Sequence, residues 1–357
     1  MKLPLVTHVL WNLGRAGAER MVFDVACLLP ERGFRVRVIA AAGGGVMEQD
    51  FRDAGIPLVI GPEVDHAWQR GKTVRFLKRE MKRERPAIWH THLGADIWGG
   101  MAARQMKMHP WIITAHGSMQ EERWPLSWLR RRAYQHADHL VSVSEDTQQR
   151  IAKQVSRSPQ TSSVIRLGVD TSLFAPRPRR ERAGAWHIVS VGRLVESKNQ
   201  LTLLRALLAV DADWRLTLVG DGPLRAELEA WCFRHRVNHR VVFAGSVADV
   251  RPLLADADLF CFASRHEGQG IAVLEAAASG VPVIASDLKV FHEAFDEESM
   301  TFVSSEDVIG WTRAMEHAMR DPWQSLKKAQ MAREIVVRSF SVERMVQEYA
   351  ALYRSLL

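Results

Sequence analysis

The most constraining feature of this sequence is an alternation of short apolar runs with amphipathic segments, which passes along the chain twice. In the first series, the runs predict strands over residues 5–10, 36–41, 57–60, 87–91, 111–115 and 139–143. Between the first two, residues 18–32 carry one apolar face and are followed by Gly33, a pattern typical of a helix. Strands that alternate with helices in this way favour a parallel sheet with helices on both faces.

The alternation is interrupted once, between Gly168 and Trp186, and then restarts. Residues 170–185 contain Pro176, Pro178 and a cluster of arginines without an apolar period, so we predict a linker there. The second series predicts strands over residues 187–191, 215–219, 241–243, 259–262, 282–285 and 301–303. We therefore expect an α/β fold of two doubly wound, Rossmann-like domains that face a cleft. The N-terminal domain covers 1–169 and the C-terminal domain 186–340.

The last segment, residues 341–357, predicts a terminal helix. Its apolar side chains form one stripe, which consists of Met345, Val346, Tyr349, Leu352, Tyr353 and Leu356. A helix this amphipathic must dock on another element.

The composition is that of a globular chain and excludes several other classes. Of the 357 residues, 47% are apolar and 25% charged, so the chain can bury a large core without disulfides. Its three cysteines are far apart and form no CxxC motif, which excludes a thiolate zinc site and suits a reducing compartment. No apolar run approaches the ~18 residues of a membrane span. The N-terminal run is interpreted as a first strand rather than a signal peptide.

The net charge of +7 is unevenly distributed. Residues 1–170 hold 25 basic and 17 acidic residues, whereas the remainder holds 23 and 24. A one-sided positive balance indicates an anionic partner, such as nucleic acid, an anionic membrane or an acidic substrate; the alternative is a merely arginine-rich surface. Because the sequence contains no nucleic-acid-binding motif, we expect no nucleic-acid partner.

Two common phosphate-binding motifs are absent from the sequence. A Walker-A loop ending at residues 71–73 would need glycine where His66 stands, and no GxGxxG follows the first strand. Gly14 and Gly17 nevertheless lie in a turn before the first helix. Such a turn lets backbone N–H groups approach a phosphate, although a plain strand-to-helix turn has the same composition.

Histidines and aspartates stand near several predicted strand ends. His90 and His92 point the same way on one strand and could converge on a metal, but no carboxylate or cysteine accompanies them. We favour a polar cluster that lines the cleft. His116 ends the next strand, where α/β sites form. Asp256 and Asp258 resemble a metal-binding DxD, but we interpret them as helix-end and turn residues. We therefore predict neither a metal site nor a cofactor.

The strongest local signal lies at residues 264–285. A strand ends, a glycine loop follows, and a helix begins near Ile271. Gly268 and Gly270 let backbone N–H groups face an anion at the helix N-terminus. Glu267 and Glu275 would repel a phosphate, so each should accept hydrogen bonds from sugar hydroxyls, Glu275 from a ribose and Glu267 from a transferred sugar.

A second signal lies in the first loop of the C-terminal domain. Arg193 offers a planar fork for phosphate oxygens, and Lys198 offers a point charge. Two cations in a loop at a strand's carboxyl end could clamp a diphosphate. The alternative is a pair of solvated surface cations.

These motifs together resemble glycosyltransferase family 4, whose members have the GT-B fold of two Rossmann-like domains. The resemblance covers nearly the whole chain. It rests on residues 14–20, His116, residues 143–145, 167–170, 191–198 and 219–223, and the pair Glu267 and Glu275. In this fold the C-terminal helix, 341–357, crosses back to the N-terminal domain.

The resemblance implies metal-independent transfer of a hexose from a nucleotide-diphosphate sugar, with retention of anomeric configuration. It assigns Arg193 and Lys198 to the diphosphate, Glu275 to the ribose, Glu267 to the donor sugar, and His116 to a place near that sugar. The loop 14–17 would border the phosphate or the acceptor. Gln269 departs from the family because an apolar residue is common there; its amide would bond the donor sugar or face solvent.

Within this family, the expected role is in synthesis of bacterial cell-surface polysaccharide, lipopolysaccharide or glycolipid. Two alternatives stay open: a nucleotide-sugar 2-epimerase of the same fold, and a non-catalytic nucleotide-sugar-binding partner.

Two basic segments suggest a further partner. Residues 72–85 and 123–132 interleave cations with apolar side chains, as a segment at a membrane interface does. Family members often use lipid-linked acceptors. We therefore expect a cytoplasmic chain that docks on the inner face of an anionic membrane. The alternative is that Leu77 and Met81 face the domain core and the cations are solvated.

Overall fold

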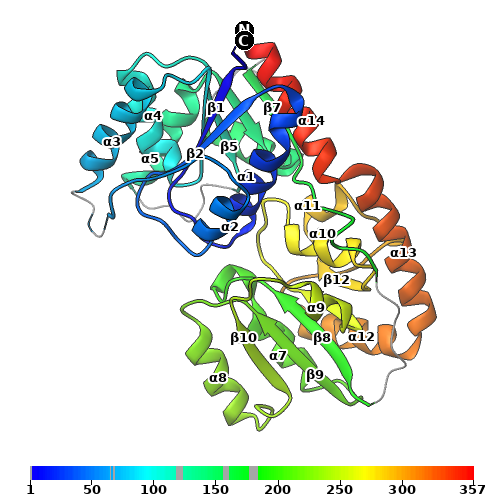
Figure 1. Cartoon of the computed structure of the whole chain (residues 1–357). Coiled ribbons are helices and arrows are strands. Elements are labelled where there is room, and N and C mark those ends of the chain that lie inside the picture. The colour runs from blue at the N-terminus through cyan, green and yellow to red at the C-terminus, as the bar shows by residue number, and fades with distance from the viewer. Residues whose placement is uncertain (1, 65, 67–68, 118–123, 156–160, 177–183) are drawn as a thin grey trace. The chain divides into compact units, whose positions relative to one another are not determined.

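The computed structural model describes residues 2–64, 66, 69–117, 124–155, 161–176 and 184–357. The chain divides into two compact units (Figure 1). Unit 1 comprises residues 1–168 and 342–357, and unit 2 comprises residues 169–341.

Unit 1 is built on a parallel sheet whose described strands follow the order β3-β2-β1-β4-β5-β6-β7. The strands are β1 (Leu5–Leu10), β2 (Arg35–Ala40), β3 (Leu58–Ile60), β4 (Ile88–His92), β5 (Trp111–Ala115), β6 (His139–Ser142) and β7 (Ser162–Val164). The helices are α1 (Gly17–Leu28), η1 (Leu29–Arg32), α2 (Glu48–Asp53), α3 (Arg70–Arg83), α4 (Ala95–Gln105), α5 (Leu126–His136), α6 (Glu145–Gln154) and α14 (Val342–Leu356).

Unit 2 repeats this plan with the strand order β10-β9-β8-β11-β12-β13. Its strands are β8 (Trp186–Val191), β9 (Trp214–Val219), β10 (Val241–Gly245), β11 (Leu259–Phe262), β12 (Val283–Ser286) and β13 (Thr301–Val303). Its helices are η4 (Glu196–Lys198), α7 (Gln200–Leu207), α8 (Arg225–Arg234), α9 (Arg251–Ala255), α10 (Ile271–Ala278), α11 (Lys289–His292), α12 (Val308–Arg320) and α13 (Pro322–Ser339).

In each sheet the strand order reverses at one point, next to the first strand of the unit. Strand β1 lies between β2 and β4, and β8 lies between β9 and β11. The loops that leave the two strands at such a switch point diverge to opposite faces, so a ligand can bind at their carboxyl ends. The segments singled out in the sequence follow these strands: residues 14–17 follow β1, residues 193–198 follow β8, and residues 264–270 follow β11.

The predicted fold class is confirmed, with small differences at strand ends. The strand β7 was not predicted because Ser162 and Ser163 carry no apolar signal, and it is a half-buried edge strand. The terminal helix α14 belongs to unit 1 and buries Met345, Val346, Tyr349 and Tyr353.

The predicted linker is only partly independent of the domains. Within residues 170–176, Phe174 packs against the core of unit 2, and its carbonyl accepts a 3.2 Å hydrogen bond from Arg333. This part of the predicted linker therefore belongs to unit 2, because the partly buried Phe174 ring packs on its core although the sequence around it has no apolar period. The arginine cluster within 177–183 lies outside the described residues.

The apolar stripe of α3 faces the core of unit 1. Leu77 and Met81 are buried among core side chains, and Val74 packs beside them. The prediction that this stripe reaches a membrane is therefore wrong. Within the described part of the chain, no helix is long and apolar enough to cross a membrane.

Candidate functional site

The loops that follow β8 and β11 are joined to each other in unit 2. The backbone N–H of Arg265 and the hydroxyl of Ser264 both donate to the carbonyl of Ser197, at 2.8 and 2.9 Å. Lys198 donates from Nζ to Oε1 of Glu267, and the ammonium lies 5.0 Å from the centre of the Phe262 ring. The predicted diphosphate-binding lysine and sugar-binding glutamate therefore form an ion pair.

This ion pair is largely buried but keeps some contact with solvent. The side chain of Lys198 is 22% exposed and that of Glu267 is 9% exposed. A partly buried carboxylate needs a cation beside it, since an unpaired buried charge is costly. Lys198 supplies that cation and still has two ammonium protons for an incoming anion.

Arg193 lies in the same loop and differs from Lys198. Its guanidinium is exposed and has no partner among the described side chains, whereas its backbone carbonyl accepts a 2.9 Å hydrogen bond from Gln200. The backbone is thus held while the cationic head stays available to an anion.

Glycines explain how the loops of unit 2 approach so closely. A Cβ on Gly220 would overlap the carbonyl oxygen of Gly192, and one on Gly222 would overlap that of Leu194. The Gly-Asp-Gly-Pro segment after β9 therefore packs backbone against backbone on the loop that carries Arg193 and Lys198.

The loop before α10 depends on Gly270, which has φ +76° and caps the helix. A Cβ there would lie 2.6 Å from the Phe291 ring, so only glycine fits. Gln269 is 7% exposed, which excludes the alternative that its amide faces solvent. Glu275 lies half-buried on α10, about one turn after the helix begins.

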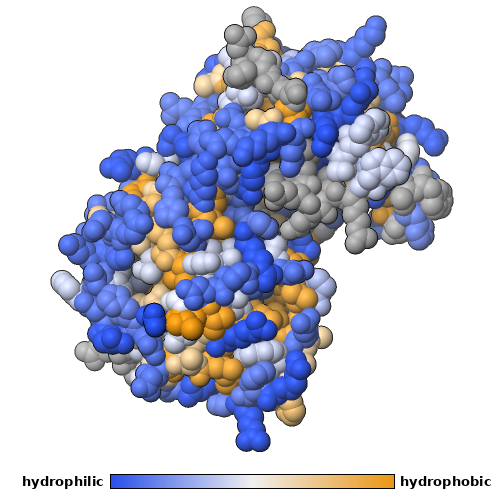
Figure 2. Space-filling view, turned by 180° about the vertical axis from the view of Figure 1, so that it is seen from behind, coloured by the Kyte–Doolittle hydropathy of each residue, from blue (hydrophilic) through white to orange (hydrophobic). Residues whose placement is uncertain are grey.

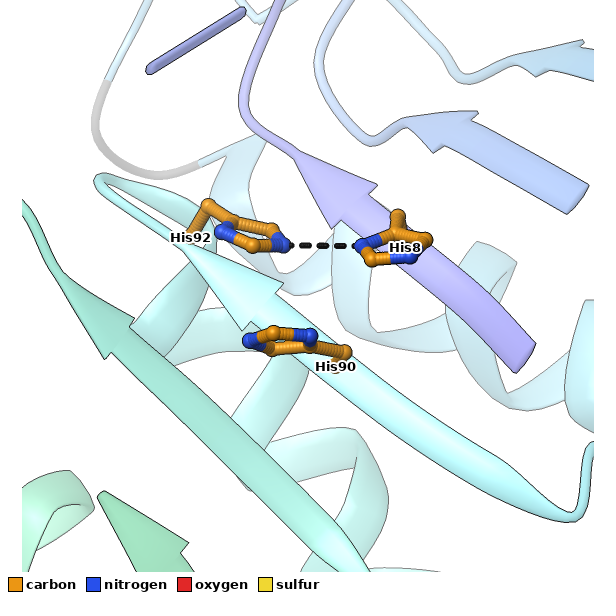
Figure 3. A group of neighbouring side chains, drawn as sticks. All are labelled: His8, His90 and His92. Carbon is orange, nitrogen blue, oxygen red and sulfur yellow. Dashed lines mark hydrogen bonds between the residues drawn. The ribbon is translucent and has the colours of Figure 1, made fainter. Parts of the chain in front are cut away.

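In unit 1, imidazoles of β1 and β4 meet at the switch point (Figure 3), and His116 follows the neighbouring strand β5. His8 Nδ1 lies 3.1 Å from His92 Nε2, and His92 Nδ1 lies 3.4 Å from His116 Nε2. His90 packs beside them, with its ring centre 4.2 Å from that of His92. We call His8, His90, His92 and His116 the histidine cluster.

The terminal helix α14 completes the surroundings of this cluster. The Tyr353 hydroxyl is hydrogen-bonded to His90 Nδ1 at 2.7 Å, and Thr114 Oγ1 to His90 Nε2 at 2.8 Å. Tyr349 in turn lies 3.0 Å from Thr114 Oγ1. Sequence reasoning missed His8 and both tyrosines as members of this site; the available signal was the strand order, which sets β1 beside β4.

Burial keeps these imidazoles neutral. Removal from water lowers the pKa of His8 and of His116 from 6.5 to about 3. It also lowers the pKa of His90 and His92, and the neighbouring imidazoles add to the effect. The candidate groups of unit 1 are therefore uncharged hydrogen-bonding rings at neutral pH.

The glycine turn after β1 precedes α1, which begins at Gly17. It is anchored by a 2.8 Å ion pair between Arg15 and Asp50 and by a hydrogen bond from the Leu13 N–H to the Gly44 carbonyl. Gly14 and Gly17 thus lie at the same switch point as the histidine cluster.

Two family models match this sequence in consecutive halves. The description "Glycosyltransferase Family 4" covers residues 15–173, and "Glycosyl transferases group 1" covers residues 185–321.

The chain belongs to the family 4 glycosyltransferases.

Curated relatives agree with this membership, and solved structures share the fold. The chain is 27% identical to the lipopolysaccharide core biosynthesis glycosyltransferase LpsE of Rhizobium meliloti, over 96% of this chain and 94% of the relative. It is 24% identical to an Escherichia coli UDP-Gal:alpha-D-GlcNAc-diphosphoundecaprenol alpha-1,3-galactosyltransferase, over 98% and 96%. Among structures, Anabaena Alr3699/HepE in complex with UDP-glucose superposes with a TM-score of 0.88 at 19% identity, covering 99% and 100%. The fold is GT-B.

In this glycosyltransferase the predicted site residues fall into two groups, one in each unit. Unit 1 holds Gly14, Gly17 and His116; unit 2 holds Arg193, Lys198, Glu267, Gly268, Gln269, Gly270 and Glu275. The structure brings Lys198 and Glu267 into direct contact and adds His8 and His92 to His116.

The DxD-like aspartates of the glycosyltransferase lie at the amino-terminal ends of the strands in unit 2. Asp258 precedes β11 and accepts a 2.9 Å hydrogen bond from the His187 N–H, while Asp256 pairs with Arg215 at 2.7 Å. Both tie strand beginnings together, away from the carboxyl ends where the candidate groups lie.

One group of described residues has the composition of a metal site. Nitrogens of His8, His90 and His92 lie within 4.8 Å of one another. A zinc ion needs each nitrogen at about 2.0–2.1 Å, and both nitrogens of His90 already contact hydroxyls. Metal binding would therefore have to break these hydrogen bonds.

Proposed function

We propose that this protein is a retaining, metal-independent hexosyltransferase that uses a nucleotide-diphosphate sugar. The observation that carries the proposal is the group after β8 and β11: Lys198 paired with Glu267, with the available guanidinium of Arg193 in the same loop. The complex of Alr3699/HepE with UDP-glucose, which has the same fold, supports such a donor.

In the proposed reaction, charge develops on the diphosphate as the bond to the sugar breaks. Arg193 and Lys198 stabilise this charge in place of a metal ion, aided by the backbone N–H groups at the start of α10. Glu275 binds the ribose, and Glu267 binds the donor sugar from its position beside Lys198. We assign the buried Gln269 to the same sugar.

In this proposal, the acceptor hydroxyl attacks the donor sugar on the same face from which the diphosphate leaves. We assign His116 a place beside the donor sugar and the loop 14–17 a place beside the phosphate or acceptor. The acceptor oxygen bonds to the sugar as the bond from the sugar to the diphosphate breaks, and the leaving diphosphate accepts the proton of the acceptor hydroxyl. This accounts for retention without a protein nucleophile. Names of relatives such as LpsE support an acceptor in lipopolysaccharide, cell-surface polysaccharide or glycolipid synthesis.

The deciding experiment starts from a screen of nucleotide sugars for thermal stabilisation. A donor present at ~100 times its Kd adds about 2.7 kcal/mol to the free energy of unfolding. Nucleotide release is then measured with and without oligosaccharide and lipid-linked acceptors, and product anomers are read by NMR. We expect release to require the acceptor and the product to keep the donor's configuration.

Each alternative predicts a different outcome. Rapid release without any acceptor, together with an epimerised sugar, would show a 2-epimerase. Tight donor binding without turnover on any acceptor would show a non-catalytic partner.

We further propose that unit 1 docks on an anionic membrane at the cytoplasmic face through charge and tryptophans. On α3, Lys72, Arg75, Arg79, Lys82 and Arg83 are exposed although the apolar stripe is buried. Trp124 is 81% exposed and Trp128 51% exposed, and Arg132 lies over the Trp128 ring at 5.5 Å. Arg123 lies outside the described residues. The face in Figure 2 is hydrophilic over much of its area, with apolar patches between. Because the apolar stripe of α3 is buried, electrostatic docking suits this helix better than insertion.

Vesicle sedimentation tests this docking. We expect binding to anionic vesicles at low salt, loss at high salt, and little binding to neutral vesicles. Arg75→Glu with Arg79→Glu and Lys82→Glu should abolish it, whereas the matched charge reversal of Arg320, Lys327 and Arg338 in unit 2 should not. Binding that ignores lipid charge, or that survives the first triple variant, would contradict the proposal.

A further inference from the structure

We propose that His8 and His92 form a directional hydrogen-bond chain that holds the His116 ring in the tautomer with its proton on Nδ1. In this assignment His8 and His92 are positioning residues, and His116 is the group they position. The inference deepens the proposed function, because it rests on the place of His116 beside the donor sugar.

The hydrogen-bond chain is continuous and runs from His8 in the buried interior to His116, which follows the end of β5. His8 lies within β1, His92 ends β4, and His116 follows β5, so three neighbouring strands contribute one ring each. The links are His8 Nδ1 to His92 Nε2 at 3.1 Å and His92 Nδ1 to His116 Nε2 at 3.4 Å. His8 and His92 are 0% exposed, and Figure 3 shows the first link.

The hydrogen-bond chain has a direction because each neutral imidazole carries one donor and one acceptor. If His8 donates from Nδ1, then His92 accepts at Nε2 and must donate from Nδ1 to His116. His116 accepts at Nε2, and its proton therefore lies on Nδ1. If the direction were reversed, His116 would donate from Nε2, and His8 would carry its proton on Nε2.

The surroundings of His8, at the buried end of the hydrogen-bond chain, decide between these two directions. His8 Nε2 is buried and has no hydrogen-bond partner among the described residues. In the first direction this atom is a bare acceptor, whereas in the second it is an N–H donor without a partner. Orphaned buried N–H groups are rarer in proteins than under-satisfied acceptors. The first direction is therefore favoured.

His90 does not compete for the links of this chain. Its two nitrogens bond to the hydroxyls of Tyr353 and Thr114, at 2.7 and 2.8 Å. Its ring packs against that of His92 at 4.2 Å between centres and restricts His92 to the position that bridges His8 and His116. The lowered pKa of His8, His92 and His116 supports the requirement that all three rings be neutral.

The experiment reads the tautomers directly in the full-length protein labelled with 15N-histidine. Two-bond 1H–15N spectra distinguish Nδ1–H from Nε2–H rings, and a His116→Gln variant identifies the His116 signals. We expect His116 and His92 to be protonated on Nδ1 in the wild type. His8→Leu should turn His116 into a mixture of tautomers, whereas His8→Asn, whose Nδ2 stands near the position of Nδ1, should restore it.

Tyr353→Phe is the matched control inside the same buried cluster. It removes a hydroxyl from His90 but no link of the chain, so the His116 tautomer should not change. Under the proposed function, His8→Leu should lower kcat by about 10-fold with the KM of the donor unchanged, since a misoriented hydrogen bond is lost without loss of donor contacts. His8→Asn should recover most of kcat.

The tautomer spectra need no substrate, so they judge the chain separately from the transferase activity. An Nε2-protonated His116 in the wild type, or a His116 tautomer unchanged in His8→Leu, would overturn the proposal even if transfer is observed. Added Zn²⁺ should leave the spectra unchanged. Loss of the His8 and His92 signals on zinc titration would instead reveal a metal site and would also overturn the chain.

Discussion

The two units of this glycosyltransferase place their candidate groups at the same point of the same topology. The groups differ in chemistry, since those of unit 1 are neutral and those of unit 2 are charged. In unit 1, neutral imidazoles lie beside the switch between β1 and β4, and His92 is the one at the carboxyl end of β4. In unit 2, the ends beside the switch between β8 and β11 hold a lysine, a glutamate and an arginine. The topology therefore selects the place, and the side chains select the chemistry.

Burial explains why the two sets differ. His8, His90 and His92 are enclosed, whereas His116 is half-buried. A neutral imidazole can be enclosed when its neighbours supply hydrogen bonds. The charges of unit 2 retain solvent contact, 22% for the side chain of Lys198, because an ion fully removed from water would need more partners than one. Unit 1 is thus suited to hydrogen bonding with sugar or acceptor, and unit 2 to an anion.

The largest expected effect is acid unfolding of unit 1 before unit 2. The pKa of His8 is about 3 in the folded state, so below pH 6.5 the unfolded state binds protons that the folded state does not. The stabilisation is complete above pH 6.5 and is lost as the pH falls towards 3. The slope is about 1.4 kcal/mol per pH unit for each such histidine. Hydrogen exchange of the whole chain at pH 7, 6 and 5 should show unit 1 losing protection first.

His8→Leu provides the control for this prediction. It removes one titrating group at similar volume, so the pH dependence of unfolding should become shallower by about 1.4 kcal/mol per pH unit. Simultaneous loss of protection in both units would break the proposed contrast between them.

The next effect concerns the charged pair. Lys198→Ala should lower turnover by roughly 10²–10³, because one electrostatic contact to the leaving group is lost. It should also destabilise unit 2 by about 1–3 kcal/mol, since the partly buried carboxylate of Glu267 loses its ion pair with Lys198. Adding Glu267→Gln should restore stability but not turnover.

Arg193→Ala separates the two roles of these cations. Its guanidinium has no described partner, so we expect the same order of loss in turnover with no loss of stability. Turnover near the wild-type value in either single variant would remove that residue from the site.

A smaller effect tests the division of labour within unit 2. Glu275→Ala should weaken binding of the nucleoside diphosphate by about 1.5–3 kcal/mol, the value of a hydrogen bond to a charged group. Glu267→Ala should leave that affinity nearly unchanged and weaken only the sugar nucleotide. Calorimetry with both ligands decides; equal losses for both ligands would refute the division.

The smallest expected effect is that of chelation. Turnover should be unchanged in EDTA, because Arg193 and Lys198 supply the positive charge that a metal would otherwise supply. If EDTA abolished turnover and Mg²⁺ or Mn²⁺ restored it, the cationic interpretation of unit 2 would fail, and Asp256, Asp258 and the histidine cluster would need reconsideration.

The candidate site of unit 2 was predictable because its residues are local in sequence. Arg193 and Lys198 lie in one loop, and Glu267, Gly270 and Glu275 lie in one loop and the helix that follows. The pairing of Lys198 with Glu267 was not predictable, since it depends on the parallel pairing of β8 with β11. Burial of Gln269 was not predictable either, since it also depends on how segments distant in sequence pack together.

The sequence by itself determined the elements of this protein, through apolar periodicity, and the local loops, through their glycines and charges. Only the tertiary structure decided what the histidines do. His8 joins His92 across 84 residues, and Tyr353 joins His90 across 263. The tertiary structure likewise turned the apolar stripe of α3 into core. The physical reason is that period and spacing specify which side chains share a face, whereas hydrogen bonds and burial depend on which faces meet.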